Sequence, residues 1–525
     1  MAVVEIILIA LVAVIALATL AQRLAIPYPI LLVLGGVALG FAPGLPSVTF
    51  DPGLIFVLFV PPLVYSAAWF TSWREFRDNR ATIGLLATGL VVLTIGVVAV
   101  VGHALVPGLT WPAALVLGTI VSSTDAVAAT AIAEHLRLPG RIVTILEGES
   151  MANDPASLVA YRLAVTTVVT GTFSLRQVGV QLVLAVVGGV AVGLAVAWLA
   201  DQVQHRLHNP PVEVTLTLLI PYVAYLVADG LGASGVLAVV TAGLVLGRHD
   251  PAVRSTASRL EAEVFWDMLV FLLNGLIFIV LGLSLRHIVA GVADRPPLAL
   301  GVEATLIILT VVLVRLLWGG VAVSLPLLAR RLLGVRAPYP RWKAIAIIGW
   351  AGMRGADTLV IALALPLTTA RGAPFPARAV IIFLTFCVIL ATLVGQGLSL
   401  PVLIRRLRLP ADDTPEREVA LARAAANQAA LARLDELVGT DGMPREVVEH
   451  LRRQHQREGQ RHAARARGER NREGEEQAEA TRRLRRAVVE AEQRAIIALR
   501  NRGDISNAAL RTVLRDLDLE EQRLE

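Results

Sequence analysis

The residues Gly148-Glu149-Ser150-Met151-Ala152-Asn153-Asp154-Pro155 place acids inside a segment, residues 141–171, that is otherwise apolar enough to span a membrane. A second apolar segment, residues 111–133, carries Ser122-Ser123-Thr124-Asp125. A charged side chain at the bilayer centre costs about 2.5 to 3.5 kcal/mol on insertion scales. Intramembrane acids usually line an ion or proton path, so these two segments predict a transport site.

The composition separates the chain into two parts. Of 525 residues, 55% are hydrophobic and only 17% are charged, and the charges are concentrated in the last quarter of the chain. This predicts a transmembrane domain over residues 1–408 and a cytoplasmic helical tail over residues 409–525. The net charge of +6 does not indicate a nucleic-acid partner, because the arginines lie in short loops or are mixed with acids in the tail. Cys387 is the single cysteine, which excludes an intrachain disulfide.

Thirteen apolar segments predict an all-α polytopic protein whose main partner is the lipid bilayer. The first is expected to be a retained span, because no positively charged region precedes it. The segments lie near residues 3–22, 28–43, 51–70, 83–105, 111–133, 141–171, 177–200, 212–230, 232–248, 263–285, 297–329, 341–366 and 377–404.

The loop charges predict the orientation of these spans. With the N-terminus outside, the cytoplasmic loops contain 15 arginines and lysines and the opposite loops contain five. Positive residues favour cytoplasmic loops, so the sequence predicts an outside N-terminus and a cytoplasmic C-terminus.

Thirteen spans can be divided into six, one connector and six, which predicts a 6+1+6 inverted repeat, and the fifth span of each half is interrupted, which predicts two broken crossing helices. The first interruption is Ser122-Ser123-Thr124-Asp125 in residues 111–133. The second lies in residues 341–366 and contains Gly349, Gly352, Arg354, Gly355, Asp357 and Thr358. Corresponding broken segments indicate a binding site near the midplane of the membrane.

Asp154 is the leading candidate for the transport site. Desolvation disfavours its charged form, so either a proton or a monovalent cation could neutralise it, and competition between them is what exchange requires. Asn153 supplies a neutral amide beside it, and Ser150 lies one turn earlier on the same helix face. The alternative is that Asp154 is a polar residue bonded into a helix interface.

The other interruption residues have two interpretations each. Unwound backbone around Thr124 would free carbonyl groups to bind a cation, whereas Asp125 could instead cap an exposed helix N-terminus. Asn274 is a lone polar residue within a span, and for it an interhelical hydrogen bond is favoured over contact with an ion.

Glu149 and Arg354 are intramembrane charges of opposite sign, and a buried charge without a partner is strongly unfavourable. The sequence therefore predicts that they pair. Glu147 could compete for the same arginine, and Asp357 is a further acid three residues beyond it. Alternatively, Arg354 lies near the interface and extends its head group toward water.

The remaining signals exclude other classes. The chain has no phosphate-binding glycine loop with Lys and Ser/Thr, so direct use of ATP is not expected. The tail, with predicted helices near 414–439 and 444–500 and renewed apolar periodicity after residue 485, fits a helical bundle or coiled coil. We therefore expect neither an enzyme nor a cofactor.

Three motifs together resemble the sodium/proton exchangers of the cation:proton antiporter superfamily. They are Ser123-Thr124-Asp125-Ala126-Val127, Glu147-Gly148-Glu149-Ser150-Met151-Ala152-Asn153-Asp154 and Gly352-Met353-Arg354-Gly355-Ala356. Their order and spacing extend the resemblance over about 400 residues, the whole predicted membrane domain.

The resemblance implies roles for particular residues. Asp154 would bind the ion or the proton, with Ser150 and the Thr124 backbone as further Na⁺ ligands, while Glu149 and Arg354 would form a stabilising pair. An Asn at 153, rather than a second Asp, implies electroneutral one-for-one exchange. The resemblance also implies a homodimer in which a core domain moves against a scaffold.

Three positions depart from the family pattern. Ser66 follows Pro61-Pro62 where many archaeal-type members have a glutamate ligand. Pro155 stands where a small residue is usual and is expected to alter the helix locally. Asp357 replaces a residue that is usually apolar, which adds an acid that could pair with Arg354 or titrate.

Together these features predict a secondary antiporter of Na⁺ and H⁺ in a bacterial plasma membrane, with K⁺ or Li⁺ as alternative cations. A cation channel or a proton-coupled transporter of another solute would use the same buried acid. A membrane sensor that signals through its tail is a third possibility.

Overall fold

The computed structural model describes residues 2–24, 26–41, 52–125, 127–136, 138–172, 175–207, 209–253, 256–332, 342–408, 414–437, 445–467, 472–502, 504 and 506–522. Contacts divide the chain into two compact units, Met1–Ala411 and Asp412–Glu525. The regular elements in the described residues are helices.

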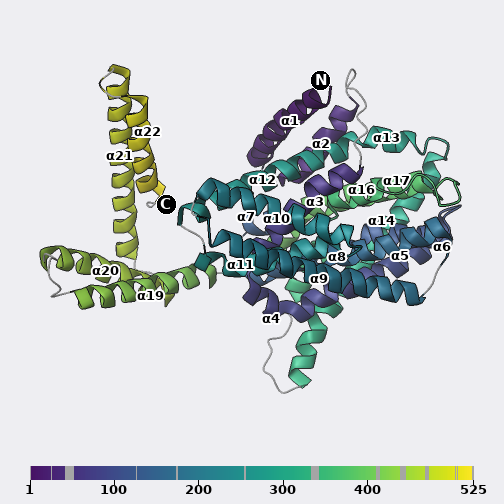
Figure 1. The fold of residues 1–525 in the computed structure, drawn as a ribbon, viewed down its shortest axis with the longest axis horizontal. Helices are drawn as coiled ribbons and strands as arrows, with labels where there is room; N and C mark the ends of the chain where they lie inside the picture. Colours follow the sequence, from purple (N-terminus) through teal and green to yellow (C-terminus); the bar gives the residue numbers. More distant parts are fainter. Residues whose placement is uncertain are drawn as a thin grey trace. The chain divides into compact units, whose positions relative to one another are not determined.

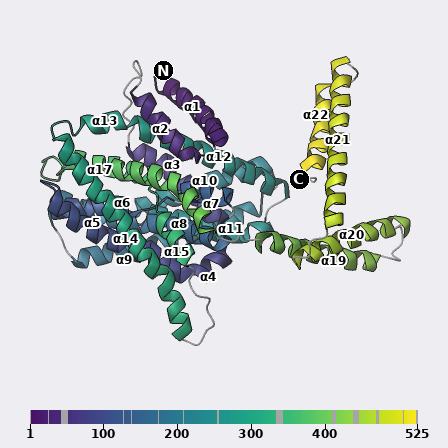
Figure 2. The same ribbon diagram turned by 180° about the vertical axis from the view of Figure 1, so that it is seen from behind.

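The first unit is a helical assembly (Figures 1 and 2). Its elements are α1 (Ala2–Leu24), α2 (Tyr28–Gly40), α3 (Pro52–Phe70), α4 (Trp73–Gly84), the π-helix η1 (Leu85–Leu90), α5 (Val91–Leu105), α6 (Trp111–Ser122), α7 (Val127–His135), α8 (Gly140–Thr170), α9 (Leu175–Gln204), α10 (Pro210–Gly230), α11 (Gly235–Val253), α12 (Thr256–Leu283), α13 (Leu285–Ala290), α14 (Pro297–Leu332), α15 (Trp342–Trp350), α16 (Ala356–Leu363), α17 (Arg378–Leu390), the π-helix η2 (Ala391–Gln396) and α18 (Gly397–Leu407).

Each predicted apolar segment falls on one or more of these helices. Six described helical runs are long and apolar enough to cross a membrane: Trp73–Leu105, Gly179–Gln204, Pro210–Gly230, Ser258–Ala290, Pro297–Leu328 and Arg378–Leu407. Five shorter apolar helices accompany them. Pro155 lies inside α8 and does not end it, because the helix continues to Thr170.

Both predicted interruptions are real breaks. The first separates α6 from α7 after Ser122, and the second separates α15 from α16 after Trp350. The two breaks touch, since the backbone N–H of Asp125 donates to the carbonyl of Met353 at 2.9 Å. A Cβ on Gly355 would lie 2.2 Å from Asp125 Oδ2, so this close approach requires glycine.

The first unit contains two apolar clusters. One is formed mainly by α3, α9, α10, α11 and part of α12, and includes the contacting rings of Tyr65, Trp69 and Trp266. The other is formed by the broken helices with α5, α8, α14 and α17, together with α1, α2 and the second half of α12. We call them the scaffold cluster and the core cluster.

The second unit contains two helical hairpins in its described part (Figure 1). In one, α19 (Thr414–Leu437) packs on α20 (Arg445–Ala466), and His455 Nδ1 lies 2.8 Å from Asn427 Oδ1. In the other, α21 (Arg472–Arg502) packs on α22 (Asn507–Gln522). The predicted helix over residues 444–500 is therefore two helices, α20 and α21.

Candidate functional site

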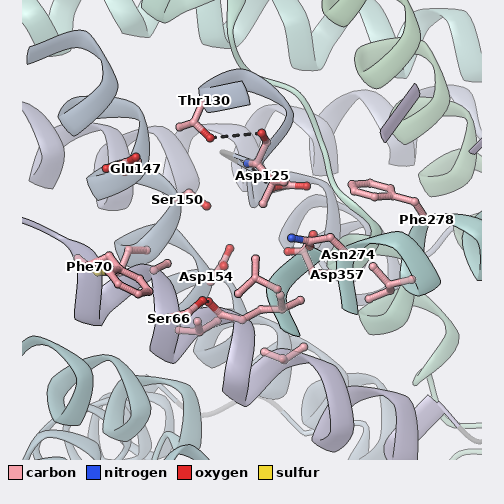
Figure 3. Close-up of a pocket in the computed structure, with 18 of the residues that line it drawn as sticks. Ser66, Phe70, Asp125, Thr130, Glu147, Ser150, Asp154, Asn274, Phe278 and Asp357 are labelled. Carbon is pink, nitrogen blue, oxygen red and sulfur yellow. Dashed lines mark hydrogen bonds between the residues drawn. The ribbon is translucent and has the colours of Figure 1, made fainter. Parts of the chain in front are cut away.

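A cavity of about 470 Å³ lies where the scaffold cluster meets the core cluster (Figure 3). Its walls come from α3, α7, α8, α12 and α16, together with Asp125 from the first break. The scaffold side includes Val60 and Val64, and the core side includes Ile277 and Ile361. The cavity therefore reaches the crossing of the two broken helices from between the two clusters.

Asp154 projects into this cavity from the middle of α8, with Ser150 one turn earlier on the same wall (Figure 3). Ser123, at the C-terminal end of α6, donates a hydrogen bond from Oγ to Asp154 Oδ1. The break in the first crossing helix is thus what brings a hydroxyl to the carboxylate. Asp154 is only partly buried, so its carboxylate remains accessible from the cavity.

A buried hydrogen-bonded chain lies behind this carboxylate. Asn153 Nδ2 donates to Thr124 Oγ1 at 2.6 Å, and Thr124 Oγ1 donates to Glu149 Oε1 at 3.1 Å. All three side chains are less than 5% exposed, and neither Thr124 nor Asn153 is among the described residues that line the cavity. The Thr124 hydroxyl is committed to this chain, which leaves its backbone as the group that could contact an ion.

The predicted Glu149–Arg354 pair is wrong, because Glu149 is paired with Arg315 from α14. Both Arg315 Nη atoms donate to the Glu149 carboxylate, Nη2 at 3.0 Å, and Nη2 also donates to the carbonyl of Ile348. The two side chains are 1% and 2% exposed. A bidentate arginine satisfies both oxygens of a buried carboxylate. Because α14 packs against α15, the Arg315 side chain bonds to α15 at Ile348 and also reaches Glu149 on α8.

Arg354 instead stabilises the ends of the broken helices. Its Nε donates to the carbonyl of Val121 at 2.9 Å, and its Nη1 donates to the carbonyl of Gly352 at 2.7 Å. Its backbone N–H donates to Thr392 Oγ1 in η2. The last carbonyls of a helix have no intrahelical partner and carry partial negative charge, so a cation is favourable where α6 and α15 end.

The opposite ends of the breaks carry acids. Asp125 Oδ1 accepts the N–H of Val127, the first residue of α7, at 2.7 Å, which confirms that Asp125 caps this helix. Asp357 lies in the first turn of α16. Both acids also line the cavity, so each combines a favourable position at a helix N-terminus with access to the space that Asp154 faces.

Most of the predicted site residues meet in this one cavity. The lining includes Asp154, Ser150, Asp125, Asp357, Ser66, Asn274 and Glu147. Ser66 Oγ donates to the carbonyl of Leu63 within its own helix. Asn274 was expected to bond between helices, but its Nδ2 has no hydrogen-bond partner among the described residues.

Two residues that contact the predicted site residues were not identified from the sequence. Arg315 is a lone basic residue in an apolar segment, a signal of the same kind as Arg354, but its distance in sequence from the motifs gave no reason to place it beside Glu149. Ser123 is part of the quoted motif, but its contact with Asp154 depends on how the first helix unwinds.

The arrangement can hold a monovalent cation through oxygen atoms, chiefly the Asp154 carboxylate with Ser150, in a partly apolar cavity. Discontinuous helices whose polar ends surround a buried carboxylate are the architecture of secondary transporters. The fold and the site therefore define a membrane transporter of this class.

Comparisons with known proteins give the family. Residues 7–406 match the family described as "Sodium/hydrogen exchanger, transmembrane", and the chain belongs to it. The chain is 35% identical to the "Uncharacterized Na(+)/H(+) exchanger Rv2287" of Mycobacterium tuberculosis, over 99% of this chain and 96% of that one. It is 31% identical to the "Uncharacterized Na(+)/H(+) exchanger YjcE" of Escherichia coli, over 95% and 94%.

A solved structure has the same fold. The sodium proton antiporter MjNhaP1 from Methanocaldococcus jannaschii matches with a TM-score of 0.61 over 78% of this chain and 99% of that chain. The sequence identity is 20%, so this likeness concerns the fold and not the details of the site.

Proposed function

We propose that the protein exchanges Na⁺ for H⁺ across a bacterial plasma membrane and that Asp154 binds either ion. The observation that carries this proposal is the position of Asp154, which faces the cavity from α8 at the crossing of two broken helices. Its carboxylate has a hydroxyl donor in Ser123 and no ion pair among the described residues. The exchanger names of the relatives support the same substrates.

Competition at Asp154 explains coupling. Protonation or cation binding neutralises the carboxylate, whereas the empty anion is unfavourable in a closed, desolvated site. Only the neutral forms would pass between the two faces of the membrane, so each cation that crosses would be matched by a proton in the opposite direction.

We further propose that exchange is electroneutral, because the residue beside Asp154 is a neutral amide. Asn153 is 1% exposed and its Nδ2 is bonded to Thr124, so this position adds no second carboxylate to the cavity. When Na⁺ is bound, its ligands would be Asp154, Ser150 and the Thr124 backbone.

The proposed topology has thirteen crossings in an inverted 6+1+6 repeat, an outside N-terminus and a cytoplasmic tail over residues 409–525. In this orientation the cavity is lined near the cytoplasmic ends of three helices, by Phe70 on α3, Glu147 on α8 and Asp267 on α12. The cavity would then open to the cytoplasm, and the scaffold cluster would form a homodimer against which the core cluster moves.

The test uses purified protein in liposomes that contain a trapped pH indicator. Addition of Na⁺, Li⁺ or K⁺ should drive proton movement in the wild type, and valinomycin in balanced K⁺ should leave the Na⁺-driven signal unchanged. Asp154→Asn should abolish it, while Asp267→Asn, on another wall of the same cavity, should retain it.

Other outcomes would redirect the proposal. Exchange that depends on the membrane potential would contradict electroneutrality while preserving antiport. Cation flux without proton movement would indicate a channel, and a response to K⁺ alone would replace Na⁺ as the substrate.

A further inference from the structure

We propose that Asp357 and Asn274 form a second binding position for the transported cation, on the wall of the cavity made by α12 and α16. Asp357 would supply the negative charge, and Asn274 would orient a water molecule of the cation's hydration shell. This inference rests on the proposed exchange function and assigns to it a position distinct from Asp154.

Asp357 is available for a cation. It lines the cavity from the first turn of α16, and the described residues include no salt bridge to it. Arg354, three residues earlier, is close enough to interact with Asp357 through charge, but its described side-chain hydrogen bonds go to the carbonyls of Val121 and Gly352. The first turn of a helix is a favourable position for negative charge, and the Asp357 side chain faces the cavity, where its oxygens can act as ligands.

Asn274 provides an independent sign of a missing ligand. Its side chain is 4% exposed and lines the same cavity from α12, a helix that packs against α16. Its Nδ2 has no partner among the described residues. Buried amide groups are nearly always hydrogen-bonded, so this donor requires an acceptor from within the cavity.

The chemistry of the pair fits a hydrated monovalent cation. An amide N–H cannot bind the cation itself, but it can donate to the oxygen of a water that the cation retains. The cavity has room for several water molecules. Figure 3 shows Asn274 and Asp357 projecting into the cavity together, with Asp154 contributed by another helix.

Electrostatics links this position to Asp154. The Asp154 and Asp357 carboxylates are close enough to interact through their charges, and like charges in a poorly solvated space repel. A cation at Asp357 relieves this repulsion and raises the local cation concentration beside Asp154. Loss of the Asp357 charge should therefore weaken the apparent affinity for Na⁺ more than it lowers the maximal rate.

The test measures the Km for Na⁺ at fixed pH in the liposome assay for Asp357→Asn, Asn274→Leu and the control Asp267→Asn. Because a carboxylate within several ångströms contributes strongly in a low dielectric, we expect about a tenfold rise in Km for Asp357→Asn. Loss of one water-mediated contact should raise Km about threefold in Asn274→Leu. Asp267→Asn also removes one negative charge from the cavity lining, but at a position on α12 two turns before Asn274, and it should change Km by less than about twofold.

A second measurement separates cation binding from a purely structural role. Na⁺ raises the melting temperature of a protein that binds it in the folded state, so the Na⁺-dependent shift should shrink in Asp357→Asn and Asn274→Leu. If Asp357 only stabilises the N-terminus of α16, Asp357→Asn will lower the melting temperature without Na⁺ and leave Km unchanged. That result would overturn the second position while leaving the exchange function intact.

The remaining outcomes are also distinguishable. An inactive wild type would overturn the exchange function and this inference with it. An equal rise in Km for Asp357→Asn and Asp267→Asn would show a general effect of cavity charge and would overturn a specific position.

Discussion

The two broken helices cross at one point but contribute different chemistry. The α6–α7 break supplies side-chain hydroxyls, with Ser123 bonded to Asp154 and Thr124 bonded to Glu149. The α15–α16 break supplies Arg354, whose side-chain bonds go to backbone carbonyls. One break therefore places a hydroxyl on the Asp154 carboxylate, and the other places a guanidinium at the helix ends that the crossing exposes.

The difference follows from what surrounds each break. The first lies against α8, which carries the polar network, whereas the second is enclosed by α14 and η2. The glycines of the second break allow the side chains of Arg315 and Asp125 to approach the backbone closely. A Cβ on Gly352 would lie 1.9 Å from Arg315 Cδ, and one on Gly355 would collide with Asp125.

The largest expected effect comes from the ion pair that joins the two breaks through α14. Arg315→Met leaves the buried Glu149 carboxylate unpaired and should lower the free energy of unfolding by about 3 to 5 kcal/mol. The measurement is reversible unfolding in detergent. The double variant Glu149→Gln with Arg315→Met should recover much of the lost stability. If the double variant is as unstable as Arg315→Met alone, the pairing is contradicted.

Arg354→Lys tests whether the second break depends on a planar guanidinium. The charge is retained, but one ammonium cannot replace the bonds to Val121 and Gly352 with the same geometry. We expect a loss of about 1.5 to 3 kcal/mol in the free energy of unfolding. An unchanged stability would show that charge alone compensates the helix ends.

Gly355→Ala tests the close contact between the breaks. The added methyl group must displace Asp125, and overpacking of this kind typically costs about 1 to 3 kcal/mol. The matched control is Gly84→Ala, where the described neighbours leave open space around the new methyl group and stability should be retained or raised. Thermal unfolding of both variants, with Na⁺ exchange as a second readout, checks the comparison.

Thr392→Val should have the smallest effect. It removes the Oγ1 acceptor of the Arg354 backbone N–H at 3.1 Å, and an unpaired buried donor costs about 1 kcal/mol or more. The control Thr305→Val removes an exposed hydroxyl that bonds only to the preceding turn. A larger loss in the control than in Thr392→Val would contradict the role of η2 in supporting the second break.

Much of the fold could be predicted because hydropathy and helix interruption are local properties. The thirteen apolar segments all fall on helices, and both breaks occur at the predicted residues. Partners of buried charges are different, because they depend on which helices pass beside one another. Arg354 was a reasonable partner for Glu149 by charge, yet α14 places Arg315 there.

Hydropathy and the positions of the acids were enough to predict an assembly of apolar helices with acids at two interruptions, since a lipid-exposed backbone permits few alternatives. The motifs around Asp154 also determined the family, which the comparisons confirm. The packing of the helices was needed to show that Asn274 lines the cavity with no described partner for its Nδ2. It was also needed to show that Ser123 bonds to Asp154 and that Arg315 pairs with Glu149. These contacts join residues far apart in the chain, and their geometry is set by how the helices pack rather than by any local pattern.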